Sequence, residues 1–317
     1  MIFFALRRLA GFAATLFAAA LVIFWLLNLL PGDPAQFILG INATPESVAR
    51  LRAQMGLDAP AYERFLNWIW GMLQGDFGMS YTQRAPVGEL IWGRLGVTLP
   101  LALFAMVISV AVGLPLGIIA ARRRGKALDT GVMVLAQTGI AIPNFWFGML
   151  LTLVFAVALR WLPPGGFTPW HEDPMAALRG LVLPSLALAL PQASIIARVM
   201  RTALVDVTGQ DFIRTARAKG LTMGEAVWQH GLRNAMLPVL TILGLQFAYL
   251  IAGTIVVENV FYLPGIGRLI YDAILQRDLV LVQGATIILI VAVTATMLVT
   301  DIAYALVDPR LRERSAP

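Results

Sequence analysis

The sequence contains no cysteine, two histidines and little charge, and these shortages exclude several kinds of protein. Without cysteine, neither a disulfide framework nor a thiolate metal site can form. Charged residues make up 13% of the chain and apolar residues 59%, against about 25% and roughly 45–50% in soluble domains. A surface with so few charges needs lipid around it, so the composition predicts an integral membrane protein.

Groupings of catalytic residues are also scarce. We expect the two histidines, His171 and His230, in loops on opposite sides of the membrane, which leaves no membrane-embedded Ser–His pair. Gly125-Lys126 is followed by alanine and lacks the earlier glycine of a phosphate-binding loop. We therefore predict no catalytic residue, no metal site and no cofactor bound by this chain. A membrane enzyme is disfavoured.

Long uncharged runs predict an all-α polytopic protein with six transmembrane helices. Spanning the hydrocarbon core takes about 20 helical residues. The run at 180–197 has 18 and carries two prolines, and the run at 131–159 is expected to bend or break near Pro143. The first run is too long for a typical signal peptide and is followed by no small-residue cleavage site. The runs are residues 9–30, 97–121, 131–159, 180–197, 235–257 and 279–300.

The distribution of lysine and arginine predicts the orientation, because these residues accumulate on the cytoplasmic side. With both termini inside and six spans, 15 of the 24 basic residues fall inside and 9 outside, while 7 of the 18 acidic residues fall inside. The inner face then carries +8 and the outer face −2. The positive charge is thus an orientation signal, and no nucleic-acid partner is expected.

The segments outside the spans show helix signals of their own. After the first span, Thr44 and Pro45 begin one amphipathic helix and a second follows with Phe65, Ile69, Met72 and Leu73 on one face, which predicts a structured extracytoplasmic segment. In the third outer loop, residues 261–265 predict a turn before a short amphipathic helix. Within a span, the spacing of Gly113 and Gly117 favours close helix packing.

Charge inside the spans is almost absent, and only Asp301 is expected within one, near its inner end. Proton and ion relays need several buried ionisable groups. No internal repeat is detectable either. A stand-alone secondary carrier is therefore the less favoured alternative.

The inner loop between spans four and five carries the strongest pattern. Residues 209–220 predict a helix with Asp211 near its positive end and Gly220 at its stop. Thr222 and Glu225 then form a capping box that begins a second helix through Trp228. Two short helices joined at a glycine predict a projecting knob, which we interpret as a docking element for a cytoplasmic partner.

These residues resemble the cytoplasmic loop of permease subunits in binding-protein-dependent ABC importers, close to the dipeptide, oligopeptide and nickel B-type subunits. The chain departs from the wider superfamily pattern, because glutamate, isoleucine and proline are missing while Ala216, Gly220 and Leu232 match. Further resemblances occur in order along the chain: Pro31-Gly32-Asp33-Pro34-Ala35, Gly75-Asp76-Phe77-Gly78, residues 258–267 and Asp308-Pro309-Arg310-Leu311-Arg312.

The resemblance implies a MetI-like type I permease fold in the bacterial inner membrane. Its partners would be a homologous second permease, two cytoplasmic ATPase subunits that use ATP, an extracytoplasmic solute-binding protein and lipid. The implied cargo is di- or oligopeptide, with nickel or another small solute as the alternative. The implied ATPase-coupling residues are Asp211, Arg214, Thr215, Ala216, Arg217, Ala218, Lys219, Gly220, Thr222, Glu225 and Leu232, and the implied binding-protein or outer-gate contacts are Phe261, Pro264, Gly265 and Gly267.

The resemblance also implies three sequence units. Residues 1–95 hold the first transmembrane helix and the extracytoplasmic segment, residues 96–307 the permease core, and residues 308–317 a cytoplasmic tail.

Overall fold

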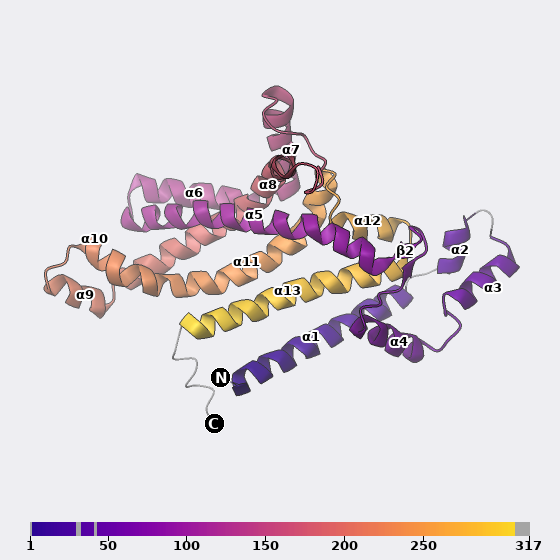
Figure 1. The fold of residues 1–317 in the computed structure, drawn as a ribbon. Coiled ribbons are helices and arrows are strands. Elements are labelled where there is room, and N and C mark those ends of the chain that lie inside the picture. The colour runs from indigo at the N-terminus through magenta and orange to yellow at the C-terminus, as the bar shows by residue number, and fades with distance from the viewer. Residues whose placement is uncertain (1, 30–32, 41–42, 308–317) are drawn as a thin grey trace.

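The computed structural model describes residues 2–29, 33–40 and 43–307, and it is almost entirely helical (Figure 1). The predicted motif at 308–312 and the predicted tail lie outside these residues. Five helices are long and apolar enough to cross a membrane. They correspond to five of the six predicted runs: Leu6–Leu29, Val87–Arg122, Pro174–Thr208, Met223–Val260 and Leu279–Thr300.

The sixth predicted span is a bent pair of helices. α6 (Ala127–Ala141) and the α7–η2 segment, Asn144–Leu151 followed by the π-helix Thr152–Ala158, meet at an angle of 102°. The break falls at Ile142 and Pro143, both of which have extended backbone, because a residue before proline is pushed out of the helical region. The predicted break near Pro143 is confirmed, and the count of six holds when the pair is taken as one span.

The run that was shortest in the sequence forms the most deeply buried helix. α8 (Pro174–Thr208) begins at Asp173, whose side chain accepts hydrogen bonds from the backbone N–H groups of Met175 and Ala176. α8 packs along α5 (Val87–Arg122), where Cβ atoms added at Gly113 and Gly117 would lie 2.7 Å from Ala193 O and 2.6 Å from Ala197 O. The close approach predicted from the spacing of these glycines is confirmed.

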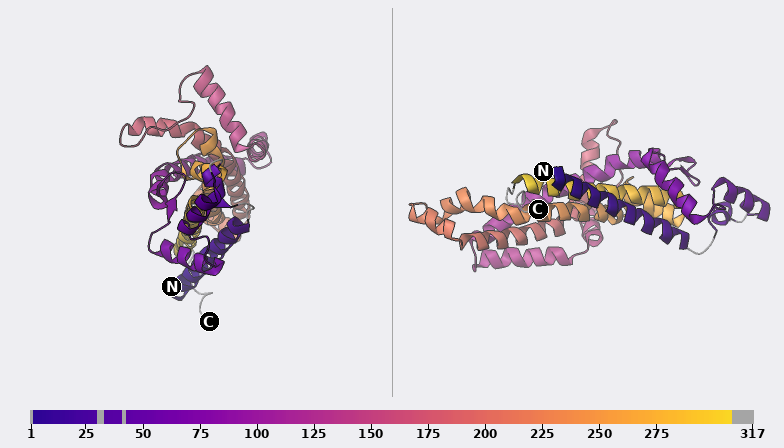
Figure 2. Two further views of the ribbon diagram at one scale, coloured as in Figure 1. Left: turned by 90° about the vertical axis from the view of Figure 1, so that its right-hand side faces the viewer. Right: turned by 90° about the horizontal axis from the view of Figure 1, so that it is seen from below.

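The molecule has two distinct ends, which the two views agree in placing far apart (Figures 1 and 2). One, the loop end, carries α9 (Asp211–Ala218) and α10 (Met223–Ala226). The other, the hairpin end, carries four short helices and the strand pair β1–β2. They are α2 (Pro34–Leu39), α3 (Pro45–Gln54), α4 (Ala61–Leu73), α12 (Ile266–Leu275), β1 (Met79–Ser80) and β2 (Ala85–Pro86).

Three long helices run between these ends: α1 (Ile2–Leu29), α11 (Leu232–Val260) and α13 (Leu279–Val307). α1 begins and α13 ends away from the hairpin end (Figure 1). α5 runs unbroken through residues 95 and 96, so the proposed boundary there stays a prediction about sequence units and marks no break in the fold.

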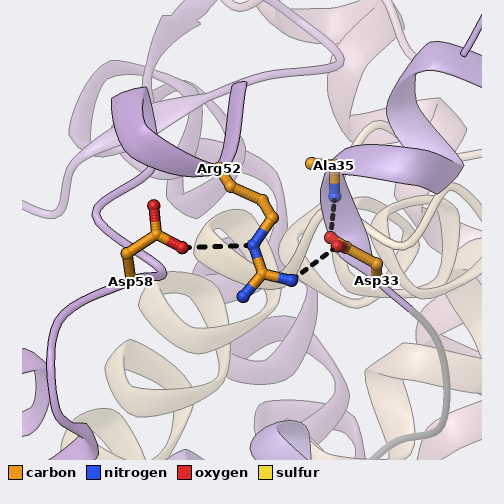
Figure 3. A network of polar contacts seen from close by, with 4 residues as sticks. All are labelled: Asp33, Ala35, Arg52 and Asp58. Carbon is orange, nitrogen blue, oxygen red and sulfur yellow. Dashed lines mark hydrogen bonds and ion pairs between the residues drawn. The ribbon is translucent and has the colours of Figure 1, made fainter. Parts of the chain in front are cut away.

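The segment after α1 folds as the sequence predicts. Thr44 caps α3 through a capping box with Ser47, and Phe65 on α4 is buried against α1 and α13. Leu73, predicted on the same face as Phe65, is 75% exposed at the last residue of α4. A polar network ties the segment together (Figure 3). Asp33 accepts from Ala35 N and pairs with Arg52 at 2.9 Å.

Arg52 completes this network with a second carboxylate. Its Nε donates to Asp58 at 3.2 Å, on the side away from Asp33 (Figure 3). The hydrogen bond to Asp33, followed by that to Asp58, holds the pKa of Arg52 above its ordinary value. The aspartate in the predicted motif at residues 31–35 therefore has a structural role, holding α2 against α3.

Candidate coupling loop and outer turn

The predicted coupling loop forms a braced helix at the loop end. α9 buries Ile213 and Ala216 against Ala226, so a small apolar cluster holds it to the start of the next helix. Its other face is exposed and carries most of the predicted coupling residues. Those exposed on α9 and at its end are Asp211, Arg214, Thr215, Arg217, Ala218, Lys219 and Gly220.

Gly220 ends α9 for reasons of backbone conformation. Its φ is +99°, a region that L-residues rarely occupy, and an added Cβ would meet nothing within 4 Å. Gly220 N and Leu221 N donate back to the carbonyls of Arg217 and Ala216, which closes the helix. Glycine is needed here for its φ and not for space.

The predicted capping box after Gly220 is present. Glu225 N donates to Thr222 Oγ1 at 3.3 Å, and Thr222 N donates to Glu225 Oε2 at 2.8 Å. Both side chains are exposed, and Leu232 is half-buried.

The helix that this box begins differs from the prediction of two separate short helices. α10 passes into the π-helix η3 (Val227–Gly231) and then directly into α11. No glycine or proline interrupts the backbone between Val227 and His230. The helix continues there as a π-turn, a feature common at functional sites. The knob is therefore one short helix mounted on the end of a membrane-spanning helix.

Apolar side chains also face outward around the loop. Trp228, on the second helix that the sequence predicts for this loop, is 70% exposed. Phe212 and Met223 are exposed as well, and neither was predicted from the sequence. Phe212 precedes the buried Ile213, so a helical-wheel reading of α9 could have placed it on the outer face.

An ion pair near the loop end was also missed. Arg201 on α8 donates to both oxygens of Asp129 on α6, at 3.0 and 2.7 Å, and Gly125 N donates to the same carboxylate. The side chain of Asp129 is buried. The expectation that Asp301 is alone within a span is therefore wrong. The side chain of Asp301 itself lies outside the described residues.

A second buried carboxylate organises the turn after α11. Glu258 is fully buried and accepts from Thr98 Oγ1 at 2.7 Å and from Arg268 N at 3.1 Å. Thr98 Oγ1 in turn accepts from Ile266 N at 2.9 Å. The predicted run ended at Val257 and so left Glu258 outside, whereas α11 continues to Val260.

Two of the predicted outer residues make room for Glu258. Gly265 lies directly against its carboxylate, and a Cβ added at Gly267 would lie 2.9 Å from its Oε2. Phe261 is buried with its ring against Gly148, and Pro264 is half-buried. Tyr262, at 69% exposed, is the residue of this turn that faces out, and the predicted role of the turn as an outer gate or binding-protein contact stays a prediction.

Asp278, between α12 and α13, joins the hairpin to the start of α13. Its Oδ2 accepts from Ser80 Oγ at 2.6 Å and from Thr82 Oγ1 at 2.7 Å, and its Oδ1 accepts from Leu281 N at the start of α13. The Gly75–Gly78 motif is structural. Asp76 accepts a hydrogen bond from Gly78 N, and Gly78 has a φ of +81°.

The fold places the chain among multi-span α-helical membrane proteins, and comparison with known families identifies the transport class. The binding-protein-dependent transport system inner membrane component family matches residues 113–313, and its N-terminal membrane component matches residues 1–102. The chain belongs to this family of ABC importer permeases, which are multi-pass proteins of the inner membrane and not enzymes.

Two relatives match the chain over almost its whole length. A putative peptide transport system permease protein of Brucella abortus (strain 2308) is 42% identical over 307 residues, covering 97% of this chain and 98% of that protein. The glutathione transport system permease protein GsiC of Salmonella choleraesuis (strain SC-B67) is 43% identical, covering 98% and 99%.

The fold resembles a solved permease. An inward-facing structure of the MetNI methionine ABC transporter superposes with a TM-score of 0.57 at 17% identity, covering 69% of this chain and 96% of that one. At this identity the similarity supports the fold alone, and it confirms the expected MetI-like architecture.

Proposed function

We propose that this chain forms half of the translocation pathway of a peptide importer and receives the ATPase movement through residues 201–235. The partners are a homologous second permease, two ATPase subunits that use ATP, and an extracytoplasmic binding protein. The chain itself binds no cofactor. The loop end then lies in the cytoplasm with both termini, and the hairpin end faces the binding protein.

One observation carries the coupling role. The exposed, charged face of α9 is braced from behind by Ile213 and Ala216, and the helix packed against it is continuous with α11. A partner that moves α9 must therefore also move a membrane span. Coupling requires that the loop interact differently with the two states of the ATPase.

Peptide is the proposed cargo because relatives more than 40% identical over nearly the whole chain are named for peptide and glutathione transport. Glutathione is itself a tripeptide. Nickel or another small solute is the alternative. Uptake by the reconstituted complex with its binding protein, comparing a labelled dipeptide, labelled glutathione and Ni²⁺, separates the cargoes.

Co-purification tests the coupling surface. Arg214→Glu with Arg217→Glu reverses two exposed charges on α9, and we expect the ATPase subunits to be recovered at much lower yield with the tagged permease. Arg50→Glu, an exposed arginine on α3 at the other end, is the matched control. Unchanged ATPase recovery in the double variant would place the contact elsewhere.

A further inference from the structure

A cavity of about 680 Å³ lies at the hairpin end and has no part in the proposed transport role. Its walls come from the last turns of α1, from α2, from the end of α3, from α4 and from the start of α13. The volume lies within the range of roughly 300–1,000 Å³ typical of small-molecule sites. The cavity is therefore large enough for a ligand.

The lining of the cavity carries net positive charge. Three arginines and one aspartate line it: Arg52, Arg64, Arg277 and Asp33. Asp33 is occupied with Arg52 at 2.9 Å. Arg277 lies over the ring of Phe37, with Cζ 3.9 Å from the ring centre. An anion is the ligand that this charge favours.

Arg64 is the cation most available to such a ligand. Within the described part of the chain it makes no ion pair; its Nη2 donates to Asn28 Oδ1 at 2.6 Å, and its guanidinium lies 5.8 Å from the centre of the Phe24 ring. Its Nε and the Nε1 of Trp68, one turn later on α4, are buried donors with no hydrogen-bond partner among the described residues. Buried donors in native proteins are nearly always paired, so a missing acceptor is indicated here.

The position of the cavity indicates the source of the anion. α1 is apolar enough to span a membrane, yet Phe17, Val22 and Leu26 are each more than half exposed. Exposed apolar side chains on a spanning helix suit lipid, and the cavity lies at the end of this helix, at the depth expected for headgroups. Phe24 and Leu27 extend its apolar lining toward the span.

We propose that this cavity binds the phosphate of a membrane phospholipid, with Arg64 and Trp68 as the donors and Arg277 adding charge. The lipid fills the space between α1 and the α2–α4 segment and holds the segment on the bundle. Guanidinium and indole N–H groups beside an apolar wall suit a phosphate that carries acyl chains.

Native mass spectrometry of the full chain, stripped of lipid in detergent and titrated with phosphatidylglycerol, tests the proposal. Loss of a charge-assisted hydrogen bond weakens binding about tenfold or more, so we expect Arg64→Gln to lower phosphatidylglycerol affinity by at least that factor. Arg50→Gln, an exposed arginine outside the cavity, should bind as the wild type does.

Parallel titrations separate the possible sources of the anion. Inorganic phosphate alone and an alanine dipeptide should each fail to displace the bound phospholipid. Displacement by either, or equal phospholipid affinity in Arg64→Gln and wild type, overturns the proposal. Trp68→Phe keeps an aromatic ring at this position and removes the indole N–H; it should weaken binding too, and it carries the test should Arg64→Gln fail to fold.

Discussion

Substitution of Gly220 separates a backbone requirement from a packing requirement in the coupling loop. A Cβ at this position would meet no atom within 4 Å, so side-chain size carries no direct steric cost. The φ of +99° costs an L-residue roughly 1–3 kcal/mol. We therefore expect Gly220→Ala and Gly220→Trp to be impaired to a similar degree, and Gly220→Asn less, because asparagine tolerates positive φ better.

The strain acts on a small unit. α9 is held by Ile213 and Ala216 alone among its own residues, so a cost of this size is enough to shift the junction between α9 and α10. A shift of 1–3 kcal/mol lowers the equilibrium constant between the native and the displaced loop by about 5- to 150-fold. ATP-driven uptake in proteoliposomes should fall accordingly, while the amount of protein in the membrane fraction stays at the wild-type level.

The relative uptake of the three variants shows whether backbone conformation or space is required at Gly220. Normal uptake in Gly220→Ala with loss only in Gly220→Trp would mean that a neighbouring surface, and not the backbone, needs the glycine. Normal uptake in all three variants would remove Gly220 from coupling altogether.

Three further changes test the buried contacts by thermal unfolding of the purified chain. Glu258→Ala leaves Thr98 Oγ1 without its acceptor, and we expect it to lower the free energy of unfolding by about 1–3 kcal/mol. Glu258→Gln should lower it less; equal losses would show that the charge of Glu258, and not its hydrogen bond, provides the stability. Asp129→Asn should cost about 2 kcal/mol, and adding Arg201→Gln should cost little more; fully additive losses would mean that the two residues are uncoupled. Gly117→Ala should destabilise by roughly 1–3 kcal/mol through overpacking, whereas Gly93→Ala, on the same helix with open space around it, should not; equal stability of the two would contradict the close packing of α5 on α8.

Local signals in the sequence predicted most of the loop and of the spans. Thr222 and Glu225 are three residues apart, and this spacing is sufficient to specify a capping box; Gly220 likewise marks the helix end before any tertiary contact forms. Pro143 identified the break in the third span for the same reason. These features depend on neighbouring residues, which the sequence displays directly.

The missed features depend on residues far apart in the chain. Asp129 meets Arg201 and Glu258 meets Thr98 only once the helices have packed. An acidic residue just past an apolar run reads as the start of a loop, so Glu258 was left outside its helix. The continuity of α10 with α11 was also hidden, because the sequence gives no sign of a π-turn between Val227 and Gly231.

The long helix that begins after Thr222 connects the coupling loop directly to the turn after α11. Met223–Val260 contains 38 residues, a length of about 57 Å at 1.5 Å per residue. One end bears the surface against which α9 packs, and the other bears the carboxylate that clamps the outer turn. In the proposed coupling, movement of α9 would reach the outer turn as rotation or tilt of this one helix, with Pro238 and the π-turn as points at which the helix can bend.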